Sequence, residues 1–140
     1  MNKTGEYRFT IIVPVYNETD NIYALEKALN EFIPKSRYKT CALFVNDGSS
    51  DGSLDRIQEV CSRSKDLYYI SFVKNAGLSA AIKAGFDYAC SDFVGYMDAD
   101  LQTTPEDFNL LLEGIEEKSM MIGIRANRKD TFFKRIQSKI

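Results

Sequence analysis

The chain has 140 residues, of which 44% are hydrophobic and 27% are charged, and its formal net charge is −2. This composition excludes an intrinsically disordered chain and predicts one soluble domain with a single hydrophobic core. Histidine is absent, which excludes Ser-His-Asp catalysis and every zinc site that needs histidine. A metal ion in this protein would therefore have oxygen ligands.

The three cysteines, Cys41, Cys61 and Cys90, lie far apart and form no CxxC motif. We therefore expect free thiols and a reducing, cytoplasmic environment. Residues 1–8 lack the apolar core of a signal peptide, and no apolar run is long enough for a membrane span. If the full-length protein continues into such spans, we expect it at the cytoplasmic face of the membrane.

Apolar, β-rich segments alternate along the chain with segments of helical spacing. We expect strands at Phe9–Val15, Cys41–Val45, Leu67–Val73, Phe93–Met97 and Met120–Ile124, and helices at 22–33, 54–61, 79–89 and 104–115. This alternation predicts an α/β fold with a parallel, doubly wound, Rossmann-like sheet. In such a sheet, ligands bind at the carboxyl ends of the strands.

The first predicted strand ends in Val13-Pro14-Val15-Tyr16-Asn17-Glu18. A rigid turn, an aromatic ring and a carboxylate at a sheet edge can hold a nucleobase and a ribose. The same residues also suit a plain strand-to-helix turn in which Asn17 or Asp20 caps the helix. Taken alone, this segment favours the plain turn.

The second predicted strand ends in Asn46-Asp47-Gly48-Ser49-Ser50-Asp51-Gly52. Its small residues allow a ligand to approach the backbone, and Asp47 can accept hydrogen bonds from a base or a sugar. The spacing copies the start of an EF-hand loop, but Gln58 stands where that loop needs a glutamate, and a strand precedes it instead of a helix. A capped turn without a ligand remains the alternative.

The third predicted strand leads into Lys74-Asn75-Ala76-Gly77 and then into an alanine-rich helix that carries Lys83. Helical N–H groups, Gly77 and the two lysines could face a diphosphate there. The segment matches neither the GxxxxGK[ST] motif nor the GxGxxG motif, so close packing of the helix on the sheet explains it equally well.

The segment Asp98-Ala99-Asp100-Leu101-Gln102 follows the fourth predicted strand. Two carboxylates this close repel each other unless they bind a cation, and hard oxygen ligands favour Mg²⁺ or Mn²⁺. The alternative is a solvated turn that caps the next helix, but Thr104 and Pro105 already have the features of that helix start. The pair therefore favours a metal ion that binds phosphate.

The end of the chain is basic, with six Lys or Arg residues and one acidic residue within 125–140, whereas residues 1–124 are acidic overall. The acidic body argues against a nucleic-acid partner. Arg125 follows the fifth predicted strand, and a guanidinium group there suits contact with a phosphate.

The last residues of the chain have helical spacing of apolar side chains opposite basic ones. Phe132, Phe133, Ile136 and Ile140 would share one face of this helix. We expect a basic amphipathic helix that contacts either an anionic membrane surface or further protein.

In their order along the chain, these segments resemble the family 2 glycosyltransferases, which have the GT-A fold. Asp98–Pro105 and Arg125–Ser138 resemble most the polyprenyl-phosphate glycosyltransferases, a group that includes the dolichyl-phosphate mannosyltransferases. The resemblance implies a nucleotide-sugar-binding core at 1–124 and a basic tail at 125–140, with an acceptor-binding part beyond it. It also implies a role in the synthesis of cell-envelope polysaccharides.

The resemblance further implies inverting, metal-dependent transfer of a sugar from a UDP- or GDP-linked donor to a polyprenyl phosphate or a glycan hydroxyl. The nucleotide sugar would contact Pro14, Tyr16, Glu18, Asp47, Lys74, Gly77, Lys83, Asp98, Ala99 and Arg125. Mn²⁺ or Mg²⁺ would be held by Asp98, Asp100 and Gln102. A catalytic base, which a hydroxyl acceptor would need, would lie beyond Ile140.

Two other functions remain open. A sugar-nucleotidyltransferase has a similar fold and metal, but it needs a basic, glycine-rich loop after its first strand, where this chain has Tyr16-Asn17-Glu18. A non-catalytic nucleotide-binding module would also be consistent with a chain that stops before the acceptor-binding part.

Overall fold

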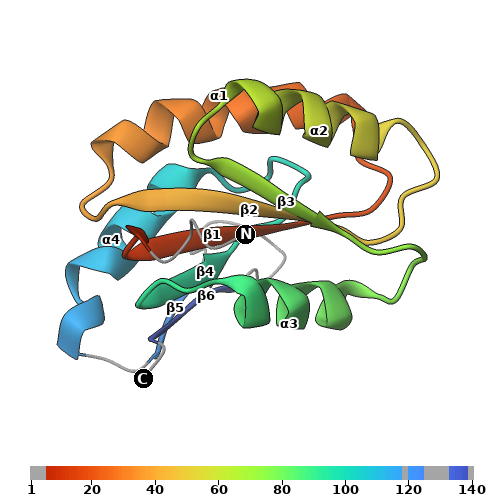
Figure 1. The fold of residues 1–140 in the computed structure, drawn as a ribbon. Helices are drawn as coiled ribbons and strands as arrows, with labels where there is room; N and C mark the ends of the chain where they lie inside the picture. Colours follow the sequence, from red (N-terminus) through yellow and green to blue (C-terminus); the bar gives the residue numbers. More distant parts are fainter. Residues whose placement is uncertain (1–5, 118–119, 125–132, 139–140) are drawn as a thin grey trace.

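The computed structural model describes residues 6–117, 120–124 and 133–138 (Figure 1). Its strands are β1 (Phe9–Val15), β2 (Thr40–Asn46), β3 (Leu67–Ser71), β4 (Phe93–Tyr96), β5 (Met120–Ile124) and β6 (Phe133–Ser138). The α-helices are α1 (Ile22–Phe32), α2 (Ser53–Arg63), α3 (Leu78–Tyr88) and α4 (Phe108–Glu113). Short 3₁₀ helices flank α1 and α4, namely η2 (Thr19–Asn21), η3 (Ile33–Lys35), η4 (Pro105–Asp107) and η5 (Ile115–Glu117). None of the helices in these ranges has both the length and the apolarity needed to cross a membrane.

The described strands form one sheet in the order β3-β2-β1-β4-β6-β5. β1 pairs in parallel with β2 and with β4, and β2 pairs in parallel with β3. These four strands confirm the predicted parallel sheet. Because β2 and β3 lie on one side of β1 and β4 lies on the other, the strand order reverses beside β1, as it does in doubly wound folds.

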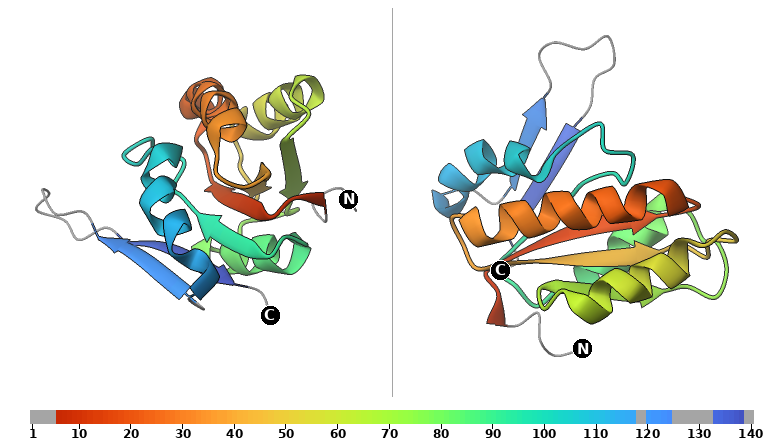
Figure 2. Two further views of the ribbon diagram at one scale, coloured as in Figure 1. Left: turned by 90° about the vertical axis from the view of Figure 1, so that its left-hand side faces the viewer. Right: turned by 90° about the horizontal axis from the view of Figure 1, so that it is seen from above.

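Helices cover both faces of the sheet, as the two views of Figure 2 show. On one face, α1, α2 and α4 pack against the side chains of Phe9, Ile11 and Val13 of β1. On the other face, α3 packs against Ile12 of β1 and Leu43 of β2. Since successive side chains of a strand point to opposite faces, a central strand in this arrangement is buried on both faces, and most of its residues are apolar. This burial explains the continuous apolar runs in the sequence.

The close contact between α3 and β1 depends on Gly85. A Cβ atom at this position would lie 2.6 Å from Cγ2 of Ile12, a side chain with no exposed surface. The small residues of α3 therefore let its backbone approach the sheet, which confirms the predicted close packing of this helix.

The helix predicted for the end of the chain is wrong for residues 133–138, which form β6. β6 runs antiparallel to both of its neighbours, and Ile136 pairs with Gly95 of β4 and with Met121 of β5. Without β6, one edge of β4 would expose unpaired backbone N–H and C=O groups, so strand pairing outweighs the helical spacing of the side chains. Residues 125–132 and 139–140 lie outside the described residues, and so do the contacts predicted for them.

Candidate functional site

The site begins where β1 and β4 separate. Their pairing ends at Ile12 and Tyr96, and the N–H group of Met97 makes the next hydrogen bond, to the carbonyl oxygen of Ile12 at 3.0 Å. Backbone groups of alternate residues face the same neighbour, so Pro14 faces β4, but proline has no N–H group to donate. The two strands diverge beyond this point, which is the position at which doubly wound sheets bind ligands.

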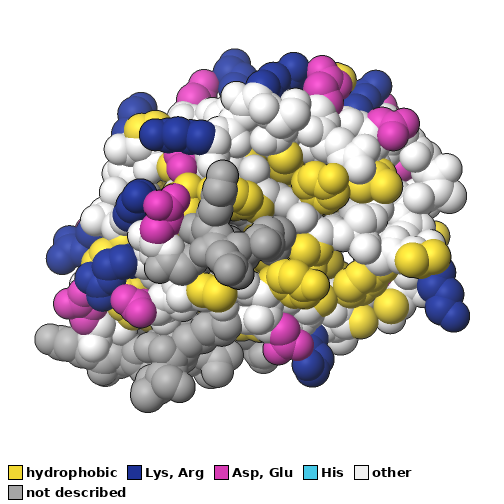
Figure 3. Space-filling model, viewed as in Figure 1, with side chains coloured by type: hydrophobic (Ala, Val, Ile, Leu, Met, Phe, Trp, Pro, Cys, Tyr) yellow, Lys and Arg dark blue, Asp and Glu magenta, His cyan; other side chains and the backbone are white. Residues whose placement is uncertain are grey.

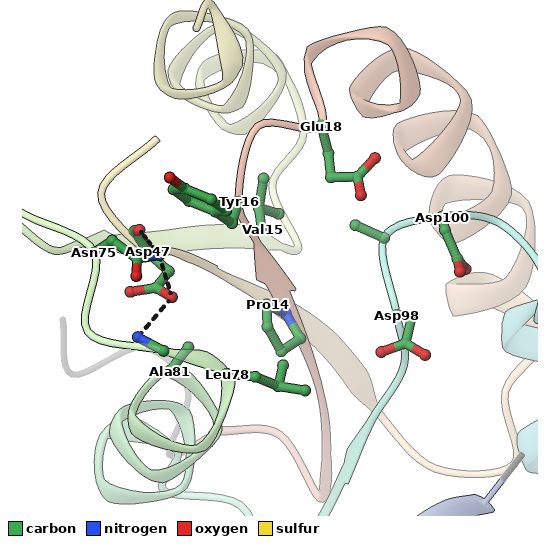
Figure 4. Close-up of a pocket in the computed structure, with 12 residues that line it drawn as sticks. Pro14, Val15, Tyr16, Glu18, Asp47, Asn75, Leu78, Ala81, Asp98 and Asp100 are labelled. Atoms are coloured by element: carbon green, nitrogen blue, oxygen red, sulfur yellow. Dashed lines mark hydrogen bonds between the residues drawn. The ribbon is translucent and has the colours of Figure 1, made fainter. Parts of the chain in front are cut away.

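A cavity of about 390 Å³ lies at this point. Eight of the predicted binding or metal residues line it, namely Pro14, Tyr16, Glu18, Asp47, Gly77, Asp98, Ala99 and Asp100. Figure 4 shows that Asp47 and Asn75 lie on one side of Pro14, while Asp98 and Asp100 lie on the other. The structure therefore brings together residues from the ends of β1, β2 and β4 and from the loop before α3.

Four further lining residues, Val15, Asn75, Leu78 and Ala81, were not among the predicted site residues. Asn75 belongs to the segment Lys74-Asn75-Ala76-Gly77, which we expected near the ligand. Its position in a loop at the carboxyl end of β3 is the signal that could have identified it. The other three are apolar, and nothing in the sequence separates them from core residues.

Other predicted residues do not reach this cavity. The Nζ atom of Lys83 lies 2.7 Å from Oδ2 of Asp87, its exposed neighbour on α3. Lys74 and Gln102 are both exposed and do not line the cavity. Arg125 lies outside the described residues. The binding roles of these four residues stay predictions.

The carboxylate of Asp47 binds the loop that precedes α3. Its Oδ1 atom accepts a hydrogen bond from the N–H group of Ala76 at 2.7 Å, and its Oδ2 atom accepts from the N–H group of Gly77 at 3.0 Å. Both N–H groups lie just before the first turn of α3, where we expected a diphosphate. In this structure they are occupied by a carboxylate of the protein itself.

The loops after β1 and β2 bind each other. The N–H group of Glu18 donates to Oγ of Ser53 at 2.9 Å, and the N–H group of Thr19 donates to Oδ2 of Asp51 at 3.3 Å. Asp51 loses some of its hydration at this position, which opposes ionisation of its carboxyl group. Hydrogen bonds from Ser53 and Thr19 have the larger effect and lower the pKa of Asp51 to about 2. Asp51 therefore serves to fix the loop that carries Tyr16 and Glu18.

The loop with the two aspartates has a defined conformation. The N–H group of Gln102 donates to Oδ1 of Asp100 at 3.1 Å, and Leu101 has a positive φ of 62°. Beyond the loop, Thr104 and Asp107 form a capping box at the start of η4, with Pro105 in the first turn, which confirms the predicted helix start. Asp98 and Asp100 are thus held by regular structure on both sides.

The cavity is acidic. The described residues that line it include four carboxylates, Glu18, Asp47, Asp98 and Asp100, and no lysine or arginine. Within the described part of the chain, no cluster of three or more carboxylate or thiol side chains is arranged to hold a metal ion by itself. Asp98 and Asp100 nevertheless offer hard oxygen donors of the kind that Mg²⁺ and Mn²⁺ prefer.

A parallel α/β sheet with a polar cavity at the point of strand reversal is the architecture of the Rossmann-like nucleotide-binding proteins. The comparison with known families is more specific. Residues 10–140 match the model of the family described as "Glycosyl transferase family 2", and the chain belongs to this family.

Two curated relatives illustrate this membership. The chain is 38% identical to the uncharacterized glycosyltransferase YkcC of Bacillus subtilis, over 91% of the chain and 40% of the relative. It is 32% identical to the undecaprenyl-phosphate 4-deoxy-4-formamido-L-arabinose transferase of Aeromonas hydrophila, over 100% of the chain and 44% of the relative. The chain thus spans about two fifths of the length of the curated relatives it matches.

Solved structures show the same fold. The S. aureus TarS fragment 1–349 matches 88% of this chain with a TM-score of 0.66 and 22% identity, and the match covers 37% of that fragment. The mannosyltransferase PcManGT from Pyrobaculum calidifontis, solved with GDP-Man and Mn²⁺, matches 67% of this chain with a TM-score of 0.59 and 25% identity, over 28% of its own length. The likeness to these solved structures confirms the predicted fold.

Proposed function

We propose that the chain supplies the donor-binding part of a metal-dependent, inverting glycosyltransferase. The donor is a UDP- or GDP-linked sugar, and the acceptor is a polyprenyl phosphate or a glycan hydroxyl. The observation that carries this proposal is the acidic lining of the cavity. A diphosphate that enters among four carboxylates meets strong repulsion unless a cation comes with it, and Asp98 and Asp100 are placed to bind that cation.

The cavity has two different sides, which suggests how the donor lies. The N–H groups of Ala76 and Gly77 already donate to Asp47, so these two donors are not available to a phosphate. We place the nucleoside there, beside the half-exposed ring of Tyr16, and the diphosphate beside Asp98 and Asp100. We also expect Arg125, which follows β5 in the sequence, to contact the phosphates.

The residues on the side of the cavity opposite Asp47 would act as metal ligands. Asp98 and Asp100 would coordinate Mn²⁺ or Mg²⁺, with Gln102 as a third proposed ligand, and the phosphate oxygens of the donor would complete the coordination. A bound divalent ion would neutralise the negative charge that develops on the nucleoside diphosphate as it leaves. The complexes of PcManGT with GDP-Man and Mn²⁺ and of TarS with UDP-GlcNAc support donors and a metal of this kind.

The acceptor decides which further groups the reaction needs. A phosphate acceptor is already ionised and attacks without a general base, whereas a hydroxyl acceptor needs a base near neutrality. The name of the undecaprenyl-phosphate relatives favours the phosphate acceptor. In that case the basic residues Arg128 and Lys129 would contact the anionic surface of the membrane, on its cytoplasmic side.

Titration with UDP and with GDP, each with and without Mn²⁺, tests this proposal. We expect one of the two to bind with Mn²⁺, and we expect Asp98→Ala and Asp100→Ala to weaken that binding at least about tenfold. Asp87→Ala is the matched control, because Asp87 pairs with Lys83 on the outer surface of α3. Equal affinities for all three variants and the parent chain would contradict the proposed metal site.

Turnover distinguishes an enzyme from a binding module. We expect these 140 residues to bind the donor but to transfer the sugar poorly, since the relatives are more than twice as long. Rapid glycosyl transfer by the 140 residues alone would contradict the view that the acceptor-binding part lies elsewhere.

A further inference from the structure

Asn75 joins two parts of the cavity wall that are far apart in the sequence. Its Nδ2 atom lies 3.0 Å from Oδ2 of Asp47 and 3.2 Å from the backbone carbonyl oxygen of Asp47. The side-chain amide therefore donates to both the carboxylate and the main chain at the end of β2. No other side chain in the described hydrogen bonds reaches the Asp47 carboxylate.

We propose that Asn75 is a positioning residue for donor binding, which fixes the Asp47 carboxylate and the loop before α3 as one rigid wall of the cavity. This inference rests on the proposed function for its effect on the donor. The hydrogen bonds on which it stands join two residues of the protein itself.

The first argument is the burial of Asp47. Its exposed fraction is 4%, and its charge is balanced by three N–H donors, from Asn75, Ala76 and Gly77. A buried carboxylate needs such donors, because its loss of hydration is otherwise uncompensated. Substitution of Asn75 removes one of these three donors, the one that comes from a side chain.

The second argument is the close contact between the two backbones. A Cβ atom on Gly48 would lie 2.2 Å from the carbonyl carbon of Lys74 and 2.3 Å from the nitrogen of Asn75. The loop before α3 thus rests directly on the loop after β2. This contact leaves no room for a side chain at position 48, and it holds the backbone of Asn75 beside Asp47, so that the Asn75 side-chain amide reaches the Asp47 carboxylate.

The third argument is the position of the wall. Asp47, Asn75, Gly77 and Leu78 all line the cavity. A displacement of the loop at Asn75 would therefore move Gly77 and Leu78 as well. An ionised aspartate at position 75 would place a second carboxylate at hydrogen-bond distance from the Asp47 carboxylate, so near neutral pH it could not replace the asparagine.

The test compares Asn75→Ala and Asn75→Asp with the matched control Asn109→Asp, which makes the same charge change at an exposed position of α4. Binding of UDP and GDP with Mn²⁺ is measured at pH about 7.5 and about 5, each variant relative to the parent chain at the same pH. We expect both Asn75 variants to bind about tenfold more weakly at the higher pH and the control to bind normally.

The pH dependence separates positioning from a general loss of structure. At the lower pH, the introduced carboxyl group of Asn75→Asp gains a proton and can donate to Asp47 as the amide did, so its binding should recover at least about threefold relative to Asn75→Ala. The inference would be overturned if Asn75→Ala bound the nucleotide normally. It would also be overturned if the loss of nucleotide affinity in Asn75→Asp were the same at both pH values.

A second readout needs no nucleotide. Amide hydrogen exchange of Ala76 and Gly77 should be faster in both Asn75 variants than in the parent chain and in Asn109→Asp. If the parent chain binds neither nucleotide, the proposed function fails, and this exchange measurement still decides the role of Asn75. Unchanged exchange at both amides would overturn the inference.

Discussion

The Oδ1 atom of Asn17 accepts a hydrogen bond from the backbone N–H group of Ser50 at 2.8 Å, although the two residues are 33 positions apart. In return, the N–H group of Asn17 donates to Oγ of Ser49 at 3.0 Å. Asn17 has a positive φ of 51°, a conformation that asparagine tolerates better than most residues. Asn17 therefore joins the loops after β1 and β2 in the conformation that presents Tyr16 and Glu18 to the cavity.

Substitution of Asn17 should separate its two contributions. Asn17→Gly removes the side-chain hydrogen bonds with Ser50 but keeps the backbone one and permits the positive φ, and we expect it to lower the free energy of unfolding by about 1 kcal/mol. Asn17→Ala adds backbone strain, so we expect a loss of about 2 kcal/mol. Urea unfolding of both variants measures the difference. If alanine were as stable as glycine here, the conformation of Asn17 would differ from the one described.

Substitution of Gly48 should disturb both stability and binding. In Gly48→Ala the new methyl group would overlap the backbone of Lys74 and Asn75, and φ is +66°. We expect the free energy of unfolding to fall by about 3 kcal/mol and nucleotide affinity to fall with it. Gly52→Ala is the matched control, since its nearest neighbour would be Cγ2 of Thr19 at 3.5 Å. Thermal unfolding and nucleotide titration should show a clear difference between the two variants.

The Asp51 carboxylate should stabilise the protein in a way that depends on pH. Its pKa in the folded protein is about 2, below the ordinary value of 3.8, so the stabilisation is present above pH 3.8 and disappears as the pH falls towards 2. Because the Asp51 side chain is exposed, solvent screening reduces the effect of this pKa shift on stability, and we expect Asp51→Asn to cost only about 1 kcal/mol at pH about 7 and nearly nothing at pH about 2.

Urea unfolding at the two pH values measures this effect. Glu31→Gln, at an exposed position of α1, serves as the control for the loss of one negative charge. A cost of Asp51→Asn that does not change with pH would show that its hydrogen bonds to Thr19 and Ser53 do not depend on its charge.

Much of the fold could be predicted from local patterns. The strands β1 and β2 are buried at every position, and this burial appears in the sequence as continuous apolar runs. The start of η4 could be predicted as well, because Thr104, Pro105 and Asp107 act within one turn of chain. Eight of the proposed site residues meet in one cavity because each lies at or beyond the carboxyl end of a parallel strand, and parallel strands end at the same edge.

The features that escaped prediction depend on contacts between distant residues. β6 forms because the backbone N–H and C=O groups at one edge of β4 need hydrogen-bond partners. The side chains of residues 133–138 give no indication of that edge. Asn75 and Asp47 are 28 positions apart, so their hydrogen bond appears only once β2 and β3 are adjacent. The ion pair of Lys83 with Asp87 differs from these features, because it is local: Asp87 follows Lys83 at the spacing of a helical ion pair, so the sequence alone could have indicated it.

The central claim is that a divalent ion and a nucleoside diphosphate bind together at Asp98 and Asp100. Two carboxylates alone hold Mn²⁺ weakly, so we expect the bound nucleotide to increase the affinity for Mn²⁺ at least about tenfold, and Mn²⁺ to increase the affinity for the nucleotide by the same factor. Electron paramagnetic resonance of free Mn²⁺, with and without UDP or GDP, measures this coupling directly. We predict strong coupling in the parent chain and in Asp87→Ala, and none in Asp98→Ala or Asp100→Ala. Nucleotide binding that is equally tight without metal, or coupling that survives both substitutions, would contradict this account.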